Sequence, residues 1–190
     1  MSVIAAIKEN GVIYMGADSQ TTFGKRKKNL TQEPTFKIKK LRSGMLVGIC
    51  GNVSAKQCIG EDERIFDIVG DALTKKEIVN GIIPKIKEKL EYWIGSSKCE
   101  EMAISIMLAY KDKLFVIEDD YSVLGIEGFY ATGAGSRYAL ASLSDSSCLS
   151  VKERLLSGLK TSARFCSSVS GPFLLIDTQT LKYEIVEENE

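Results

Sequence analysis

Residues 2–20 read SVIAAIKENGVIYMGADSQ and set two short apolar runs on either side of a turn. The first run covers residues 3–7, the second covers residues 12–17, and the dipeptide Asn-Gly lies between them. Asn-Gly is a preferred two-residue hairpin turn because both residues tolerate a positive φ. Apolar runs this continuous are typical of strands that are buried on both faces. The stretch therefore predicts an antiparallel hairpin within a layered core, with its second strand ending at the acid Asp18.

The remainder of the chain alternates between blocks of strands and blocks of helices. Further strands are expected over residues 36–41, 45–50, 102–110, 114–118, 128–132, 173–177 and 183–186. Helices are expected over residues 64–71, 78–94 and 151–166, and after the glycine-rich segment 133–135. The helix over 78–94 repeats Ile or Leu every four residues, with Val79, Ile83 and Trp93 widening its apolar face. Pro84 is expected to kink or break it. The polar residues 21–35 are expected to be a long loop.

This order of elements predicts the architecture. Strands joined by hairpins form antiparallel sheets, and helices between such blocks cover the outer faces of those sheets. We therefore expect an α+β fold, a four-layer αββα sandwich of two antiparallel sheets flanked by helices. No linker or low-complexity segment interrupts the chain, which predicts a single domain over residues 1–190.

Composition narrows the classes of function. Lys plus Arg and Asp plus Glu number 25 each, so no net charge attracts nucleic acid or an anionic membrane. Apolar runs of 18 or more residues and export signals are both missing, so we expect a cytoplasmic protein without nucleic-acid or membrane partners. The five cysteines are scattered without a CxxC pair, and the acids at 118–120 match no compact ligand set. We therefore expect neither disulfides nor a metal site.

The chain contains no histidine. This excludes the Ser-His-Asp triad, the Cys-His pair and the HExxH zinc site. If the protein activates a nucleophile, its base must be a lysine, a carboxylate or the α-amino group of the chain.

The N-terminal stretch resembles the start of the proteasome β-type and HslV-type peptidases, which are N-terminal nucleophile (Ntn) hydrolases. In that family a Thr, occasionally a Ser, begins the first strand, and the second strand ends in a G-[AG]-D motif. Gly16-Ala17-Asp18 looks like this motif, and the spacing then puts Ser2 at the nucleophile position. The resemblance implies that Met1 must be removed first, which exposes the α-amine of Ser2.

The resemblance also implies roles for other residues. Asp18 would anchor Lys37, and Lys37 would tune and orient the amine and hydroxyl of Ser2. The free amine, with a reference pKa of about 7.7–8.0, can accept the hydroxyl proton near neutral pH. The N–H of Gly51 would help to form the oxyanion hole, and Ile49 would line the pocket for a substrate side chain. No cofactor is expected.

Two positions depart from the family pattern. Ala134 occupies the place of the serine in the family's G-S-G segment, and Ser136 is a candidate substitute. Arg164 falls where the family has a later acid, with Ser167 the candidate match to a nearby serine. If Met1 is retained, the amine of Ser2 is a peptide nitrogen and supplies no base.

These observations favour a peptidase subunit that cleaves peptides or unfolded proteins. The resemblance implies a homo-oligomeric ring and an AAA+ unfoldase partner. One alternative is a non-catalytic ring or scaffold subunit that retains Met1. Another is an Ntn amide hydrolase or acyltransferase that acts on a small molecule. Taken singly, a serine such as Ser2 is more often only a polar start to a strand, and an acid such as Asp18 is more often a turn cap.

Overall fold

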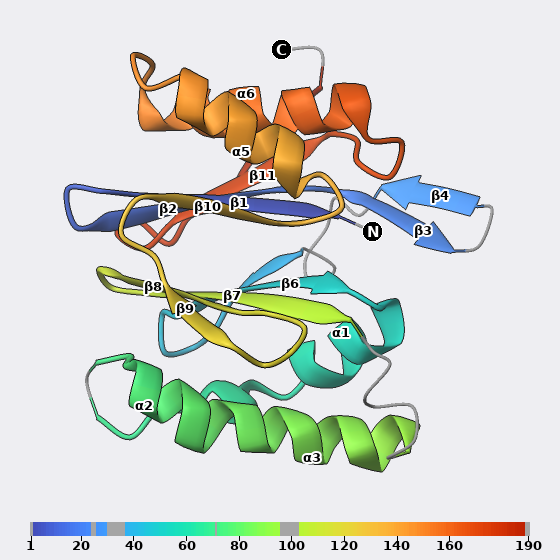
Figure 1. Ribbon diagram of the computed structural model, residues 1–190, viewed down its shortest axis with the longest axis vertical. Coiled ribbons are helices and arrows are strands. Elements are labelled where there is room, and N and C mark those ends of the chain that lie inside the picture. Colours follow the sequence, from blue (N-terminus) through green and yellow to red (C-terminus); the bar gives the residue numbers. More distant parts are fainter. Residues whose placement is uncertain (1, 24–25, 30–36, 71, 96–102, 189–190) are drawn as a thin grey trace.

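Two antiparallel β-sheets lie face to face in the computed structural model, and helices cover both outer faces (Figure 1). The structure describes residues 2–23, 26–29, 37–70, 72–95 and 103–188. The four layers confirm the predicted α+β sandwich of αββα type.

The first sheet has the strand order β10-β1-β2-β11-β12, so it joins the beginning of the chain to its end. Its strands are β1 (Val3–Glu9), β2 (Val12–Asp18), β10 (Phe129–Gly133), β11 (Phe173–Asp177) and β12 (Glu184–Val186). Helices α5 (Ser136–Asp145) and α6 (Val151–Phe165) pack on its outer face (Figure 1).

The second sheet has the order β5-β6-β7-β8-β9. Its strands are β5 (Ile38–Lys40), β6 (Leu46–Gly51), β7 (Ile104–Tyr110), β8 (Lys113–Ile117) and β9 (Val123–Gly125). Its outer face is covered by α1 (Val53–Gly60), the 3-10 turn η1 (Glu63–Phe66), α2 (Lys75–Glu77), the π-turn η2 (Ile78–Ile82) and α3 (Ile83–Ile94).

The predicted hairpin is present as β1 and β2. Its turn residues Asn10 and Gly11 have φ of 51° and 77°, the conformation that fits the twist of two antiparallel strands. Along β1, successive side chains point to opposite faces of the sheet. Ile4 packs between the two sheets and Ala5 packs beneath the helices of the first sheet, and both are fully buried. The continuous apolar run thus reflects a strand with a core on each side.

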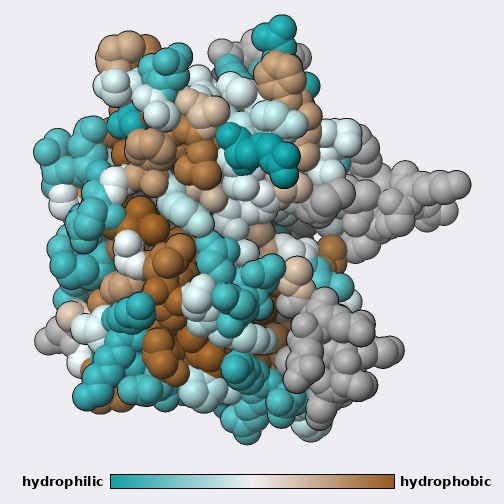
Figure 2. All heavy atoms as spheres, viewed as in Figure 1, coloured by the Kyte–Doolittle hydropathy of each residue, from teal (hydrophilic) through white to brown (hydrophobic). Residues whose placement is uncertain are grey.

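Three hydrophobic cores separate the four layers. One lies between the sheets, one between the first sheet and α5 and α6, and one between the second sheet and the helices around α3. Figure 2 shows apolar side chains near the middle of one face, with hydrophilic side chains around them. The layers place the ends of β2 and β6 and the start of β5 close to one another, which builds the site described below.

The helix predicted over residues 78–94 is not uniform. Pro84 is at the start of α3, directly after the π-turn η2. Proline has no N–H to donate to the preceding turn, which agrees with the predicted break. Of the three residues predicted to widen the apolar face, Ile83 is buried as predicted, whereas Val79 and Trp93 are 43% and 64% exposed, so the predicted face was too wide.

Several elements differ from the sequence prediction. The stretch predicted as a loop contains a hairpin of β3 (Gln20–Phe23) and β4 (Arg26–Asn29), which projects from the end of the sandwich (Figure 1). Helix α1 and strand β9 were not predicted, since both are short and follow strands closely. The helix predicted over residues 64–71 is only the 3-10 turn η1.

Candidate active site

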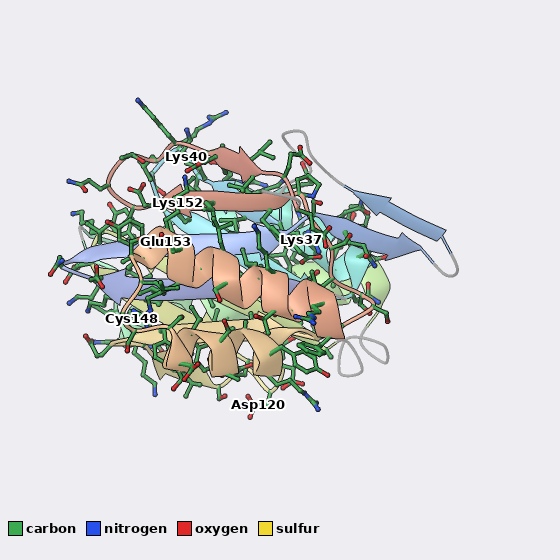
Figure 3. The ribbon with its side chains drawn as sticks, turned by 90° about the horizontal axis from the view of Figure 1, so that it is seen from above. Lys37, Lys40, Asp120, Cys148, Lys152 and Glu153 are labelled. Atoms are coloured by element: carbon green, nitrogen blue, oxygen red, sulfur yellow. The ribbon has the colours of Figure 1, made fainter. Side chains whose placement is uncertain are left out.

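Asp18 and Lys37 form an ion pair in the interior of the sandwich. Asp18 is the last residue of β2 in the first sheet, and Lys37 directly precedes β5 in the second. The Nζ atom of Lys37 lies 2.7 Å from Oδ1 of Asp18, and both side chains are almost fully buried. In Figure 3, Lys37 lies inside the molecule, toward the side that carries hairpin β3–β4. The pair therefore links the two sheets.

The Asp18 carboxylate also accepts two hydrogen bonds from the main chain. The N–H of Val3 donates to Oδ1 at 2.9 Å, and the N–H of Gln20 donates to Oδ2 at 3.2 Å. Lys37 in turn donates to the carbonyl oxygen of Gln20 at 2.6 Å. Burial raises the pKa of Asp18, while the Lys37 ammonium and the two amides act in the opposite direction. A buried cation and two amide donors thus compensate an acid at the end of a strand.

Ser2 is buried beside this ion pair. It is bonded to Val3, whose N–H holds the same Asp18 oxygen that accepts from Lys37. The carbonyl oxygen of Ser2 accepts a hydrogen bond from the N–H of Gly135 at 3.3 Å. Residues far apart in the sequence therefore meet here, as the spacing of the motif implies. Met1 lies outside the described residues, and so does the expectation about its removal.

The glycine-rich segment 133–135 closes tightly around Ser2. Gly133 has a φ of +93°, and a Cβ atom there would lie 2.3 Å from the carbonyl oxygen of Ser2. The fully buried Ser162 of α6 donates its hydroxyl to the carbonyl oxygen of Gly135 at 2.9 Å. Ser162 was not predicted from the sequence, although its place three residues after Leu159 on the apolar stripe of α6 was a signal.

Gly51 is the last residue of β6. Its φ is +119°, and a Cβ atom there would lie 2.2 Å from the carbonyl oxygen of Ala103, so only glycine fits. Asn52 then caps α1, accepting hydrogen bonds from the amides of Ser54 and Ala55. The oxyanion role of the Gly51 N–H stays a prediction.

A narrow pocket opens beside Lys37. Its lining consists of Lys37, Lys39, Leu41, Val47, Ile49, Lys56, Gly60 and Phe66. Ile49 is therefore in the wall of a pocket next to the ion pair, where the resemblance implies a pocket for a substrate side chain. Lys40, one residue after Lys39, faces elsewhere and donates to the carbonyl oxygen of Leu181. Lys56 was not predicted from the sequence, because helix α1, which carries it, was not predicted either.

Four residues mark the departures from the family pattern or their candidate substitutes, and they lie near the start of α5 and the end of α6. Ala134 is exposed in the turn before α5, and Ser136 is the first residue of that helix. Arg164 is exposed near the end of α6, with its guanidinium 5.6 Å from the ring centroid of Phe165. The carbonyl oxygen of Ser167 accepts a hydrogen bond from Gln20 Nε2 at 3.2 Å. A supporting role for the hydroxyls of Ser136 and Ser167 stays a prediction.

Replacing Lys56 with methionine is expected to stabilise the protein at neutral pH. Burial, and then the nearby charge of Lys37, lower the pKa of Lys56 to about 8. The folded state thus binds this proton less tightly than the unfolded chain, so the wild type gains stability as pH rises from about 8 to about 10.5. Lys56→Met should raise the free energy of unfolding by about 1–2 kcal/mol at pH 7 and by much less at pH 10. Urea denaturation at both pH values measures the difference, and an equal effect at both would contradict the assignment.

Neither a metal cluster nor a membrane span appears in the described ranges. Groups of three or more His, Cys, Asp or Glu residues arranged to hold a metal ion are missing from them. Within these same ranges, no helix is both long enough and apolar enough to cross a membrane.

Known proteins of similar sequence are peptidase subunits. The chain is 24% identical over 172 residues to the ATP-dependent protease subunit HslV of Staphylococcus haemolyticus, covering 87% of this chain and 89% of that protein. The HslV subunit of Staphylococcus aureus matches to the same extent. No protein-family model matches the chain.

Known structures share the fold. Thiobacillus denitrificans BPH has a TM-score of 0.76 at 19% identity, covering 95% of this chain and 98% of that one. Anbu (ancestral beta-subunit) from Yersinia bercovieri has a TM-score of 0.75 at 15% identity, covering 98% and 88%. HslV from Trypanosoma brucei has a TM-score of 0.66 at 14% identity, covering 92% and 98%. Sequence similarity and fold together support a proteasome-like subunit of the Ntn-hydrolase type.

Proposed function

We propose that the chain is a single-domain, proteasome-like peptidase subunit over residues 1–190, with Ser2 as its nucleophile after Met1 is removed. One observation carries the proposal. The N–H of Val3 and the ammonium of Lys37 share Oδ1 of Asp18, at 2.9 Å and 2.7 Å. This contact holds the residue next to the amino terminus against a buried cation, in a chain with no histidine to act as base.

The chemistry follows from these groups. The free α-amine of Ser2 accepts the hydroxyl proton as Oγ attacks the carbonyl carbon of the substrate. The charge of Lys37 favours the neutral, basic form of that amine, and Asp18 fixes the position of Lys37. The N–H of Gly51 donates to the oxyanion that forms. The protonated amine then gives its proton to the leaving amine, which completes the acyl-enzyme.

Hydrolysis of the acyl-enzyme uses the same base. The amine of Ser2 takes a proton from water, and the hydroxide attacks the ester carbonyl. Collapse of this second tetrahedral intermediate breaks the bond to Oγ and returns the proton to Ser2. No cofactor or metal ion is needed for either half of the cycle.

The assembly and its partners are also part of the proposal. HslV of Staphylococcus haemolyticus is named as a subunit of an ATP-dependent protease, and Anbu of Pseudomonas aeruginosa forms a helical assembly. For this chain we infer a homo-oligomer, by family resemblance a ring, that takes unfolded protein from an AAA+ unfoldase in the cytoplasm.

A non-catalytic subunit on the same fold is the second candidate. Ala134 and Arg164 favour it, because they cannot supply the hydroxyl and the acid of the family pattern. In that case Met1 persists, and Asp18 and Lys37 serve only to join the sheets. A small-molecule amide hydrolase predicts a monomer or dimer instead of a ring, which one sizing experiment distinguishes.

The first test is covalent labelling of the intact protein. Epoxomicin, which is bound in a Thiobacillus denitrificans BPH complex, is the probe. The proposal predicts loss of Met1 in the intact mass, and then the addition of one epoxomicin molecule per chain on the N-terminal peptide. Ser2→Ala should lose the adduct. Persistence of Met1 together with an unlabelled chain would favour the non-catalytic subunit.

A further inference from the structure

The pocket beside the candidate nucleophile carries an excess of positive charge. Its walls are apolar at Leu41, Val47, Ile49 and Phe66, yet three lysines also line it: Lys37, Lys39 and Lys56. Its free volume is only about 20 Å³, so the group that enters it must be small. The few polar groups of a mostly apolar pocket select the ligand group that enters. The partners of each lysine show which ammonium group is available to a ligand.

Two of the three lysines are paired within the protein. Lys37 is paired with Asp18. Lys39 lies 2.9 Å from Oε1 of Glu61 and also donates to the carbonyl oxygen of Gly60. Within the described part of the chain, the ammonium group of Lys56 makes neither an ion pair nor a hydrogen bond. Three ammonium groups thus face two carboxylates, and the uncompensated charge belongs to Lys56.

The surroundings of Lys56 disfavour its positive charge. Lys56 is the fourth of the eight residues of α1, and the first turn of this helix contains no acid that could pair with it. Burial lowers the pKa of Lys56 to about 8, and the charge of Lys37 adds to that effect. An anion in the pocket would offset both the burial of the Lys56 ammonium and its repulsion by Lys37, whereas a neutral side chain would offset neither.

We propose that Lys56 is a specificity-determining residue and that this pocket takes the carboxylate of an acidic substrate side chain, Asp or Glu. The proposal rests on the function given above, since it names the residue class preceding the bond that Ser2 cleaves. Ile49, Phe66 and Lys39 line the same pocket. Gly60 also lines the pocket, and a Cβ atom there would lie at ordinary contact distance from Lys39 and Ile49, 3.8 and 3.9 Å away.

Binding is tested first, without turnover. The probes are two N-acetylated peptide amides of the same sequence, one ending in Glu and the other in Gln. Each is titrated by calorimetry into processed Ser2→Ala protein. We expect the Glu peptide to bind about tenfold more tightly, as a charged hydrogen bond in a partly buried site predicts. Adding Lys56→Met should abolish this difference. Equal affinities of the two peptides for the Ser2→Ala protein that retains Lys56 would overturn the proposal. A difference in affinity that survives Lys56→Met would overturn it as well.

A matched control removes one lysine charge elsewhere. Lys152 is half-exposed on α6, paired with Glu184, and lies well away from Lys37 in Figure 3. Lys152→Met should keep the full preference for the Glu peptide. Loss of the preference in this variant would show a general charge effect and overturn the role of Lys56. A NMR titration of the lysine side chains supplies a second readout, in which the pKa of Lys56 rises when the Glu peptide binds.

Turnover separates this proposal from the proposed function. Fluorogenic peptides with Glu, Asp, Gln or Leu before the cleaved bond are compared in wild type and Lys56→Met. A preference for Glu or Asp that disappears in Lys56→Met supports both proposals. Cleavage without any acidic preference overturns the role of Lys56 and leaves the peptidase intact. Cleavage of none of the peptides, with binding still selective for Glu, overturns the peptidase and leaves the pocket.

Discussion

Ser2→Ala is expected to lower kcat for a fluorogenic peptide by about 10³-fold or more, because the hydroxyl that forms the acyl-enzyme is removed. The fold should not change, since Ser2 contributes a carbonyl contact to Gly135 that alanine keeps. The measurement is peptide turnover by processed protein, with intact mass verifying that both proteins begin at residue 2. Any turnover that remains in Ser2→Ala then measures only the contributions of substrate binding and of the proposed oxyanion donor.

Ser19→Ala is the matched control for Ser2→Ala. Ser19 is also buried and lies directly after Asp18, and its hydroxyl has no hydrogen-bond partner in the described part of the chain. Its replacement should leave turnover within about twofold and stability unchanged or slightly higher, because an unpaired buried hydroxyl is removed. Equal rates for Ser2→Ala and wild type would remove Ser2 from the mechanism.

Asp18→Ala is expected to lower the free energy of unfolding by about 3–5 kcal/mol, because it leaves the Lys37 ammonium buried without a counter-ion. It also leaves the N–H groups of Val3 and Gln20 without their acceptor. Urea denaturation measures the loss. Glu184→Ala, which breaks the half-exposed pair with Lys152, should cost less than about 1 kcal/mol under the same conditions.

A double-mutant cycle assigns this loss to the charges themselves. Asp18→Asn keeps an oxygen to accept the N–H of Val3, so combining it with Lys37→Met isolates the ion pair. The two changes should be non-additive by about 1–3 kcal/mol, because residues in one buried network are coupled. Additivity within about 0.5 kcal/mol would mean that the pair contributes no coupling, against our interpretation. All three variants should lack peptide turnover.

The sequence predicted the parts of the fold that depend on local pattern. The hairpin at Asn10-Gly11, the strands after it and the long amphipathic helices follow from turn chemistry and periodicity, and the layers follow from their order. Helix α1 was missed because its eight residues mix polar and apolar types with little periodicity. Hairpin β3–β4 was missed because its sequence is polar, and polarity alone was taken to indicate a loop.

Some residues of the candidate site could also be predicted from the sequence, and others could not. Asp18 and Lys37 were paired from the resemblance, and the structure places them 2.7 Å apart. Their separation of 19 residues, on different sheets, has no signature in periodicity. Lys56 and Ser162 depend on how α1 and α6 pack against the sheets, so only the three-dimensional arrangement brought them to the site. The catalytic roles themselves stay predictions until the variants are measured.

The hydrogen bond between the Val3 amide and Asp18 separates maturation from folding. Strand β1 is held by a hydrogen bond at Val3, the residue directly after the proposed nucleophile Ser2. The pairing of β1 with its neighbours therefore does not depend on the residues that precede Ser2. A precursor and its trimmed product should therefore share one architecture, and in the proposed mechanism removal of Met1 supplies the base without a change of fold.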